Sequence, residues 1–137
     1  MNVGKIPVEE YKSFANDFNP VKYDPQTWVR LAKEAGMKYM VITTKHHDGF
    51  ALFDSKVTDW DVVDATPWGK DLIAPLADAC HQYDMPLGFY YSHAQDWMHP
   101  GGSARRVKAG KGYANPDSVR IDMVRTQNID YCINFTP

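Results

Sequence analysis

The sequence predicts an α/β fold of the (β/α) TIM-barrel type, because helical and strand patterns alternate along it. Their order is helix, strand, long loop, helix, strand, long loop and helix. Polar residues follow both strands directly, at the edge where parallel α/β folds carry their ligand sites. Neither strand is followed by a Gly-rich phosphate-binding turn, which disfavours an open, doubly wound sheet. A complete barrel takes ~250 residues, so we expect residues 1–137 to form one partial barrel domain.

Composition argues against two classes of partner. The formal net charge is −2 and both signs are interspersed, whereas a nucleic-acid or anionic-membrane surface favours a basic patch. No apolar run approaches the roughly 20 residues that a membrane span needs, and the first residues lack the pattern of a secretory signal. We therefore expect no nucleic-acid partner and no membrane partner. Cys80 and Cys132 are too far apart for a metal-site spacing and are expected to be buried free thiols.

Two helices are expected before the first strand. Apolar residues recur at spacings of three and four from Val8 to Phe18, which is typical of a short helix with one apolar face. In the second helix, Asp24 is placed to cap the amino terminus and Pro25 occupies the first helical position. Gly36 ends that helix. Its apolar stripe consists of Trp28, Leu31, Ala32 and Ala35.

Two short apolar runs predict buried parallel strands. The first, Tyr39 to Thr44, is rich in β-branched residues and follows the second helix after a very short connection. The second, Pro86 to Tyr91, follows a predicted helix from Asp71 to about Tyr83, in which Pro75 is tolerated in the first turns. Residues 48–70 form a long irregular loop, which we expect to be functional or folded onto its own aromatic residues.

The end of the chain predicts one more helix. A Gly- and Lys-rich loop from Gly101 to Gly112 precedes a helical pattern from Asp117 to about Ile133. Its apolar periodicity is weaker than that of the earlier helices, because Asn128 interrupts it.

The strongest candidate for chemistry is the segment after the first strand, Lys45-His46-His47-Asp48-Gly49-Phe50. By periodicity alone, two interpretations stay open: both histidines are functional, or one is functional and the other lies in the core or at the surface. A metal site is the other functional interpretation, and zinc needs three convergent ligands. His46, His47 and Asp48 are adjacent and rarely converge alone, so His93 and His99 would have to complete such a site.

Four segments of the chain have a recognisable order and spacing: Trp28 to Tyr39, Thr43 to Phe50, Asp54 to Trp60 and Gly88 to Ser92. In this order and spacing they resemble α-L-fucosidases, retaining exo-glycosidases whose catalytic domain is a (β/α) barrel. The resemblance implies hydrolysis of terminal α-L-fucosyl residues of glycoconjugates, without a cofactor or metal, and a fucose-containing glycan as the partner. His46, His47 and Tyr90 correspond to residues that hold the hydroxyls of L-fucose. Trp68 and Trp97 are expected to line the cleft.

The chemistry of the sugar agrees with these residue types. L-fucose is a neutral 6-deoxy sugar, so its recognition depends on directional hydrogen bonds and on an apolar surface for its methyl group. A neutral imidazole offers one donor and one acceptor, and a phenol offers both from one oxygen. Aromatic residues make up 13% of the chain, and their faces suit the C–H surfaces of a sugar ring, although a large core also uses them.

Retaining hydrolysis needs two carboxyl groups roughly 5 Å apart, one as nucleophile and one as acid/base. The resemblance places the nucleophile, an Asp, on a later strand, the acid/base, a Glu, farther on, and a further fucose-binding histidine upstream of Met1. We therefore predict no catalytic residue in this chain and expect a central part of a fucosidase barrel. None of the loop carboxylates near the predicted cleft is assigned as nucleophile: Asp48, Asp59, Asp61 and Asp96.

Two other functions remain open. A carbohydrate-binding pseudoenzyme would keep fucose recognition without turnover, and a metal-dependent hydrolase would use the histidines with a bound ion. A partial barrel exposes strand edges, so association into homo-oligomers is also expected. Members of the resembling family are secreted, periplasmic or lysosomal, and these residues do not indicate which.

Overall fold

The computed structural model describes residues 6–92 and 96–98 of the chain. Its elements are, in order, helix α1 (Val8–Ser13), the 3₁₀ helix η1 (Phe14–Asp17), helix α2 (Pro25–Glu34), strand β1 (Met40–Lys45), helix α3 (Ile73–Gln82) and strand β2 (Leu87–Tyr91). In this part of the chain, no helix has the length and apolar character that a membrane crossing requires. The helix expected from Asp117, together with Cys132, His93 and His99, lies outside the described residues.

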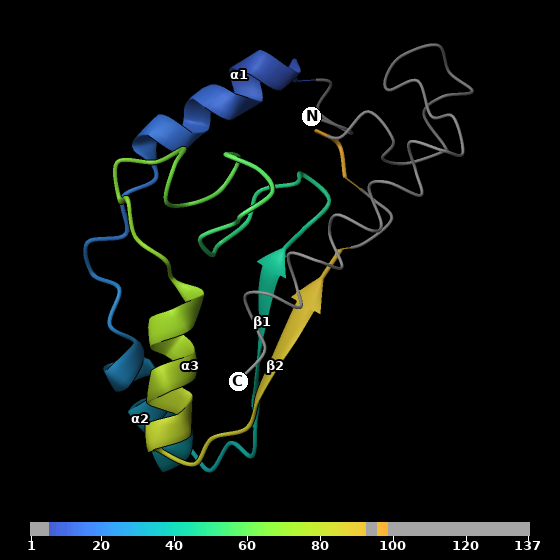
Figure 1. The fold of residues 1–137 in the computed structure, drawn as a ribbon. Coiled ribbons are helices and arrows are strands. Elements are labelled where there is room, and N and C mark those ends of the chain that lie inside the picture. Colours follow the sequence, from blue (N-terminus) through green and yellow to red (C-terminus); the bar gives the residue numbers. More distant parts are fainter. Residues whose placement is uncertain (1–5, 93–95, 99–137) are drawn as a thin grey trace.

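Strands β1 and β2 form a two-stranded parallel sheet, joined by a connection that contains α3. Helices α2 and α3 lie side by side on one face of this sheet, and α1 lies across the end at which both strands point (Figure 1). The structure therefore confirms the predicted alternation of helices with parallel strands. The described residues contain these two strands of the expected barrel.

The pairing of the two strands contains a β-bulge. Thr43 pairs with Tyr90 and Lys45 pairs with Tyr91, so Thr44 is an extra residue in β1. The Thr44 hydroxyl donates a hydrogen bond of 3.0 Å to the carbonyl of Tyr90. Because of the bulge, Thr44 and Lys45 are both buried although they are consecutive in a strand.

Two apolar clusters hold the helices to the sheet. The first lies between α2 and α3 and consists of Val29, Ala32, Leu76, Ala79, Cys80 and Met85. The second joins the start of α3 to the long loop and consists of Ala51, Phe53 and Ile73. Ile42 of β1 packs against both clusters, so the first strand is the common wall of the core. Cys80 is a buried free thiol, as expected, and this burial raises its pKa.

Helix α2 begins as the sequence predicts. The Asp24 side chain accepts a 3.1 Å hydrogen bond from the Thr27 N–H, and Pro25 occupies the first helical position. The helix expected from Val8 to Phe18 differs, because it divides into α1 and the 3₁₀ helix η1.

The face that α2 buries differs from the expected apolar stripe. Val29 and Ala32 are buried, whereas Trp28 and Leu31 are about half exposed. The helix turns Val29 toward α3, and the Trp28 ring packs edge-to-face on Tyr23 with ring centroids 5.0 Å apart. The stripe is therefore wider than the surface that α3 and the sheet cover.

The face of the sheet opposite the two helices is uncovered in the described residues. Val41 exposes 62% of its surface and Tyr39, directly before β1, exposes 67%. The strands were expected to be buried, and this expectation is correct only for their helix-facing side. Parallel sheets are normally covered on both faces.

The long loop between β1 and α3 is folded onto its own residues, as expected. Phe53 and Val62 are fully buried within it. The Asp61 carboxylate is also buried and accepts hydrogen bonds of 2.8 to 3.0 Å from the backbone N–H groups of Ser55, Val63 and Asp64. This single side chain therefore organises the middle of the loop.

Candidate functional site

Four aromatic side chains form a row at the carboxyl ends of β1 and β2. The ring centroids of His46 and His47 are 4.0 Å apart. Tyr90 stacks on His46 at 5.6 Å with an interplanar angle of 27°, and Trp97 lies 5.9 Å from His47. These four residues are called the ring row below. The structure thus brings together four of the five predicted site residues, and it does so at the predicted edge of the sheet.

The two ends of the ring row differ in exposure. Tyr90 exposes 42% of its surface and His46 is also exposed, so both can reach a ligand from solvent. His47 is half-buried, and its Nδ1 lies 2.8 Å from the hydroxyl oxygen of Ser92. A hydroxyl both donates and accepts, so Ser92 can support either tautomer of His47. The row therefore combines two solvent-exposed groups, the imidazole of His46 and the phenol of Tyr90, with the imidazole of His47, whose orientation Ser92 fixes.

The surroundings of His47 favour its neutral form. Burial lowers the pKa of His47, and electrostatic interactions with His46 and Lys45 lower it further, while Asp48 acts in the opposite direction. The ordinary pKa of histidine is about 6.5, so the imidazole is neutral at pH 7. A neutral ring next to a tyrosine hydroxyl is suited to hydrogen bonds with an uncharged, hydroxyl-rich ligand.

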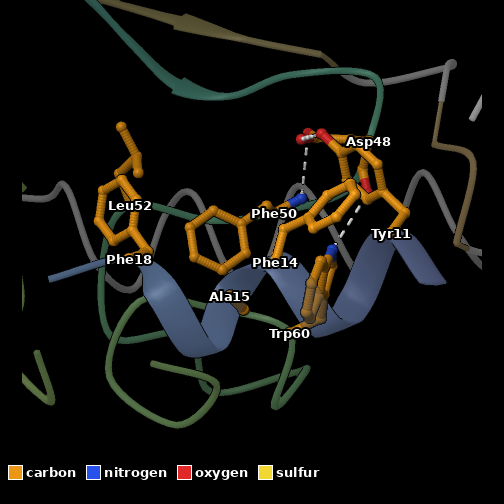
Figure 2. A pocket seen from close by; sticks show the side chains of 8 residues that line it. All are labelled: Tyr11, Phe14, Ala15, Phe18, Asp48, Phe50, Leu52 and Trp60. Atoms are coloured by element: carbon orange, nitrogen blue, oxygen red, sulfur yellow. Dashed lines mark hydrogen bonds between the residues drawn. The ribbon is translucent and has the colours of Figure 1, made fainter. Parts of the chain in front are cut away.

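Asp48 is engaged on the side of the loop that faces α1. Its Oδ2 accepts a 2.8 Å hydrogen bond from the Tyr11 hydroxyl, and its Oδ1 accepts a 3.3 Å bond from the Phe50 N–H. Its backbone carbonyl accepts a 3.1 Å bond from the Trp60 indole (Figure 2). Burial, together with the bond to Asp48, raises the pKa of Tyr11 to about 12. Asp48 thus anchors the loop.

A pocket of about 230 Å³ lies between α1, η1 and this loop. Its lining is mainly aromatic, as Figure 2 shows: Tyr11, Phe14, Ala15, Phe18, Asp48, Phe50, Leu52 and Trp60. No residue of the ring row lines it. The rings of Phe50 and Trp60 pack edge-to-face at 5.0 Å, so the pocket walls are braced by contacts among themselves.

Trp68, the fifth predicted site residue, lies apart from the ring row. The Lys70 ammonium lies over its ring at 5.3 Å from the centroid, and its indole N–H is buried without a partner among the described residues. No contact described for Trp68 joins it to the histidines. Trp60 is the tryptophan of the long loop that contacts the His-His-Asp segment, through the Asp48 carbonyl.

Sequence reasoning missed how the two loops are joined. The ammonium of Lys45 lies 3.1 Å from Asp96 Oδ2, and the Trp97 N–H donates a 2.7 Å hydrogen bond to the carbonyl of His47. These contacts connect the loop after β1 with the loop after β2, and no local sequence signal marks them.

The described part of the chain contains no group of three His, Cys, Asp or Glu side chains that could hold a metal ion. The metal interpretation would depend on His93 and His99, which lie outside the described residues. What the described geometry can do chemically is to hydrogen-bond a neutral ligand through His46, His47 and Tyr90.

The chain is similar in sequence to α-L-fucosidases. The family model for alpha-L-fucosidase matches residues 4–122. An alpha-L-fucosidase of Branchiostoma floridae is 38% identical over 96 residues, which cover 69% of this chain and 21% of that protein. The tissue alpha-L-fucosidase of Mus musculus is 37% identical over 95 residues, with the same two shares covered. The chain thus spans about one fifth of the length of these relatives.

Solved structures show the same similarity. Alpha-L-fucosidase isoenzyme 1 from Paenibacillus thiaminolyticus is 44% identical with a TM-score of 0.79, and the match covers 92% of this chain and 31% of that one. The alpha-L-fucosidase AlfC from Lactobacillus casei, in complex with its alpha-L-fucose product, is 40% identical with a TM-score of 0.73. That match covers 94% of this chain and 41% of AlfC.

Proposed function

Because the chain belongs to the α-L-fucosidase family, we propose that it supplies part of the fucose-binding rim of an enzyme that hydrolyses terminal α-L-fucosyl residues by a retaining mechanism. The observation that carries this proposal is the ring row, which places His46, His47 and Tyr90 in contact at the carboxyl ends of two neighbouring parallel strands. The substrate class is a glycan with a terminal L-fucose.

Each side chain of the row has a role in this proposal. His46 and Tyr90, which are exposed, hydrogen-bond the sugar hydroxyls. The neutral His47, which is half-buried, adds one further hydrogen-bond donor or acceptor. Trp97 forms an apolar wall beside His47. The assignment of Trp68 to the cleft wall rests on its position in the long loop alone.

A closed (β/α) barrel is the fold that we propose around this site. Its support is the uncovered apolar face of the sheet at Tyr39 and Val41, since parallel strands are normally buried on both faces. In the described residues the sheet consists of β1 and β2, and Ala51 forms an isolated bridge with Lys45 at the end of β1. Further strands on either side would extend this sheet, and where they are absent, association into homo-oligomers is expected.

No carboxylate of the described residues is proposed as the nucleophile. Asp48 is bonded to Tyr11, Asp96 is paired with Lys45 and Asp61 is enclosed by backbone N–H groups. Asp59 is exposed in the long loop, and no described contact directs it to the ring row. The two carboxyl groups of the retaining reaction are therefore assigned to other parts of the enzyme.

The proposal is tested by titrating the chain with L-fucose and following the histidine ring signals by NMR. L-galactose, which carries a hydroxyl on the C6 methyl position, and D-glucose are the control sugars. His46→Ala and Tyr90→Phe are expected to weaken L-fucose binding about tenfold, because each removes a hydrogen bond to a buried sugar hydroxyl. His81→Ala, an exposed histidine on α3, is the matched control. Binding that neither site variant weakens would contradict the assignment.

A fucose-binding protein without turnover is the second candidate function. The observation that favours it is the engagement of Asp48, Asp61 and Asp96 in structural contacts, which leaves the ring row without a free carboxyl partner among them. Release of 4-nitrophenol from 4-nitrophenyl α-L-fucopyranoside separates the two candidates. Turnover that His46→Ala abolishes excludes the non-catalytic candidate. Saturable binding of L-fucose without release of 4-nitrophenol supports it.

A further inference from the structure

The last residue of β1 carries a buried ion pair to the loop after β2. The side chain of Lys45 is 4% exposed and that of Asp96 is 10% exposed, and Lys45 Nζ lies 3.1 Å from Asp96 Oδ2. Lys45 Nζ also donates a 2.9 Å hydrogen bond to the carbonyl of Ser92. Its ammonium lies 5.0 Å from the centroid of the Tyr91 ring. One lysine thus contacts both the end of β2 and the loop beyond it.

The Asp96 carboxylate is fitted closely against Gly49. Asp96 Oδ1 accepts a 2.9 Å hydrogen bond from the Met98 N–H. A Cβ atom added at Gly49 would lie only 2.5 Å from the same oxygen, and Gly49 has φ +77°, which favours glycine. The carboxylate therefore occupies space that any other residue at position 49 would fill.

These contacts surround the backbone of the ring row. Lys45 precedes His46 directly, and Gly49 follows His47 after one residue. From the other loop, the Trp97 N–H donates to the His47 carbonyl at 2.7 Å, and Ser92 Oγ contacts the His47 ring. Asp96 is the immediate neighbour of Trp97, so movement of its carboxylate would displace the Trp97 N–H from His47.

We propose that Lys45 and Asp96, with Gly49 providing space for the carboxylate, are positioning residues that fix His47 and Trp97 relative to each other for sugar binding. The inference rests on the proposed function only for the identity of the ligand. Neither residue touches the sugar. The pair acts by holding the loop after β1 and the loop after β2 in a fixed relative position, so that the ring row is assembled before a ligand arrives.

A buried pair of opposite charges suits this role. Removing one partner leaves an unpaired charge in the interior, which is strongly unfavourable, whereas removing both charges is much better tolerated. The stability of the fold and the arrangement of the ring row can therefore be separated by comparing single and double variants.

The groups that face His47 and titrate or carry charge are His46, Lys45 and Asp48. Replacing Lys45 by Met consequently raises the pKa of His47.

The experiment uses Lys45→Met, Asp96→Asn, the double variant and Gly49→Ala. Gly49→Ala displaces the Asp96 carboxylate without changing any charge. Lys33→Met is the matched control, because the Lys33 ammonium also bridges two segments, through a 2.8 Å bond to the Asp84 carbonyl at the opposite end of the sheet. NMR measures the cross-peak between the rings of His47 and Trp97 and the titration of His47. L-fucose affinity is measured on the same samples.

The folded variants of the pair and Gly49→Ala are expected to lose the ring cross-peak and to bind L-fucose about tenfold more weakly. Lys33→Met is expected to keep both. If the double variant and Gly49→Ala fold and retain the cross-peak and the affinity within about twofold, and the charge-neutral Gly49→Ala also retains the His47 titration, the inference is overturned. Unfolding of all four variants beside a folded control would make the pair purely structural and would also overturn it.

The two proposals fail in different ways. If the unaltered chain does not bind L-fucose, the proposed function fails, while the ring cross-peak and the His47 titration of Gly49→Ala still decide the positioning role. If the unaltered chain binds L-fucose and the double variant binds it equally well, only the positioning inference fails.

Discussion

The hydroxyl of Tyr11 donates a 2.8 Å hydrogen bond to Asp48 Oδ2, so helix α1 is fastened to a loop that follows it by 37 residues. From its other side, the same loop is tied to Asp96 through Lys45. His46 and His47 are therefore carried by a segment that is held from two directions. Four measurements probe how the fold supports this arrangement.

Replacing Tyr11 by Phe removes the bond to Asp48 and keeps the ring in the aromatic pocket. We expect the free energy of unfolding to fall by about 1 kcal/mol, because a partly buried carboxylate loses one of its hydrogen bonds. Urea denaturation measures the change. Tyr39→Phe is the matched control, since Tyr39 is 67% exposed. An equal effect of the two substitutions would show that the bond to Asp48 contributes nothing.

Acid is expected to destabilise the fold through His47. Burial lowers the pKa of His47 in the folded chain, so the unfolded chain takes up a proton first as the pH falls below about 6.5. The stabilising contribution is therefore complete above the unfolded pKa and is lost as the pH falls through the folded pKa. His47→Gln should flatten the dependence of unfolding free energy on pH between about 7.5 and 5, as measured by urea denaturation at each pH.

Asp61→Asn is expected to destabilise the long loop. The carboxylate accepts three hydrogen bonds, from the backbone N–H groups of Ser55, Val63 and Asp64. An amide would turn its NH₂ group toward at least one of these donors. The cost should be about 1–3 kcal/mol of unfolding free energy. Asp59→Asn, on an exposed side chain of the same loop, is the control. Thermal melts of the two variants that coincide would refute this role for Asp61.

Two leucines test which faces of the helices form the core. Leu76 of α3 is 1% exposed, whereas Leu31 of α2 is 51% exposed. Leu76→Ala should cost about 2–5 kcal/mol because it leaves a cavity between α2, α3 and the sheet. Leu31→Ala should cost less than ~1 kcal/mol. A large effect at Leu31 in chemical denaturation would mean that additional protein covers this side of α2.

Local signals in the sequence were sufficient for much of the fold. The cap at Asp24, the proline after it and the apolar run before His46 each act within a few residues, and each is found where it was predicted. The ring row could also be predicted from the sequence, because the carboxyl ends of neighbouring parallel strands meet at one edge of a sheet. Tyr90 lies on the second strand that the pattern identified, and His46 directly follows the first.

The remaining features depend on contacts between distant segments. Helical periodicity gives the width of an apolar stripe but not the part that a neighbour covers, so the exposure of Trp28 could not be derived. Likewise, nothing near Lys45 indicates that its partner is Asp96, 51 residues later, because the pairing depends on how two loops meet. The sequence also offered no basis for preferring Trp60 over Trp68 as the contact of the His-His-Asp segment.

The β-bulge at Thr44 has a consequence for protein engineering. Side chains alternate between the two faces of a regular strand, so one extra residue reverses the direction of every side chain after it. Lys45 is the residue of β1 that follows the bulge, and its side chain points to the interior, where it meets Asp96. Transplanting Lys45 to Phe50 onto the end of a regular strand would therefore turn the lysine away from the side on which it meets its partner. A graft of this motif needs the threonine and its irregular pairing as part of the transferred unit.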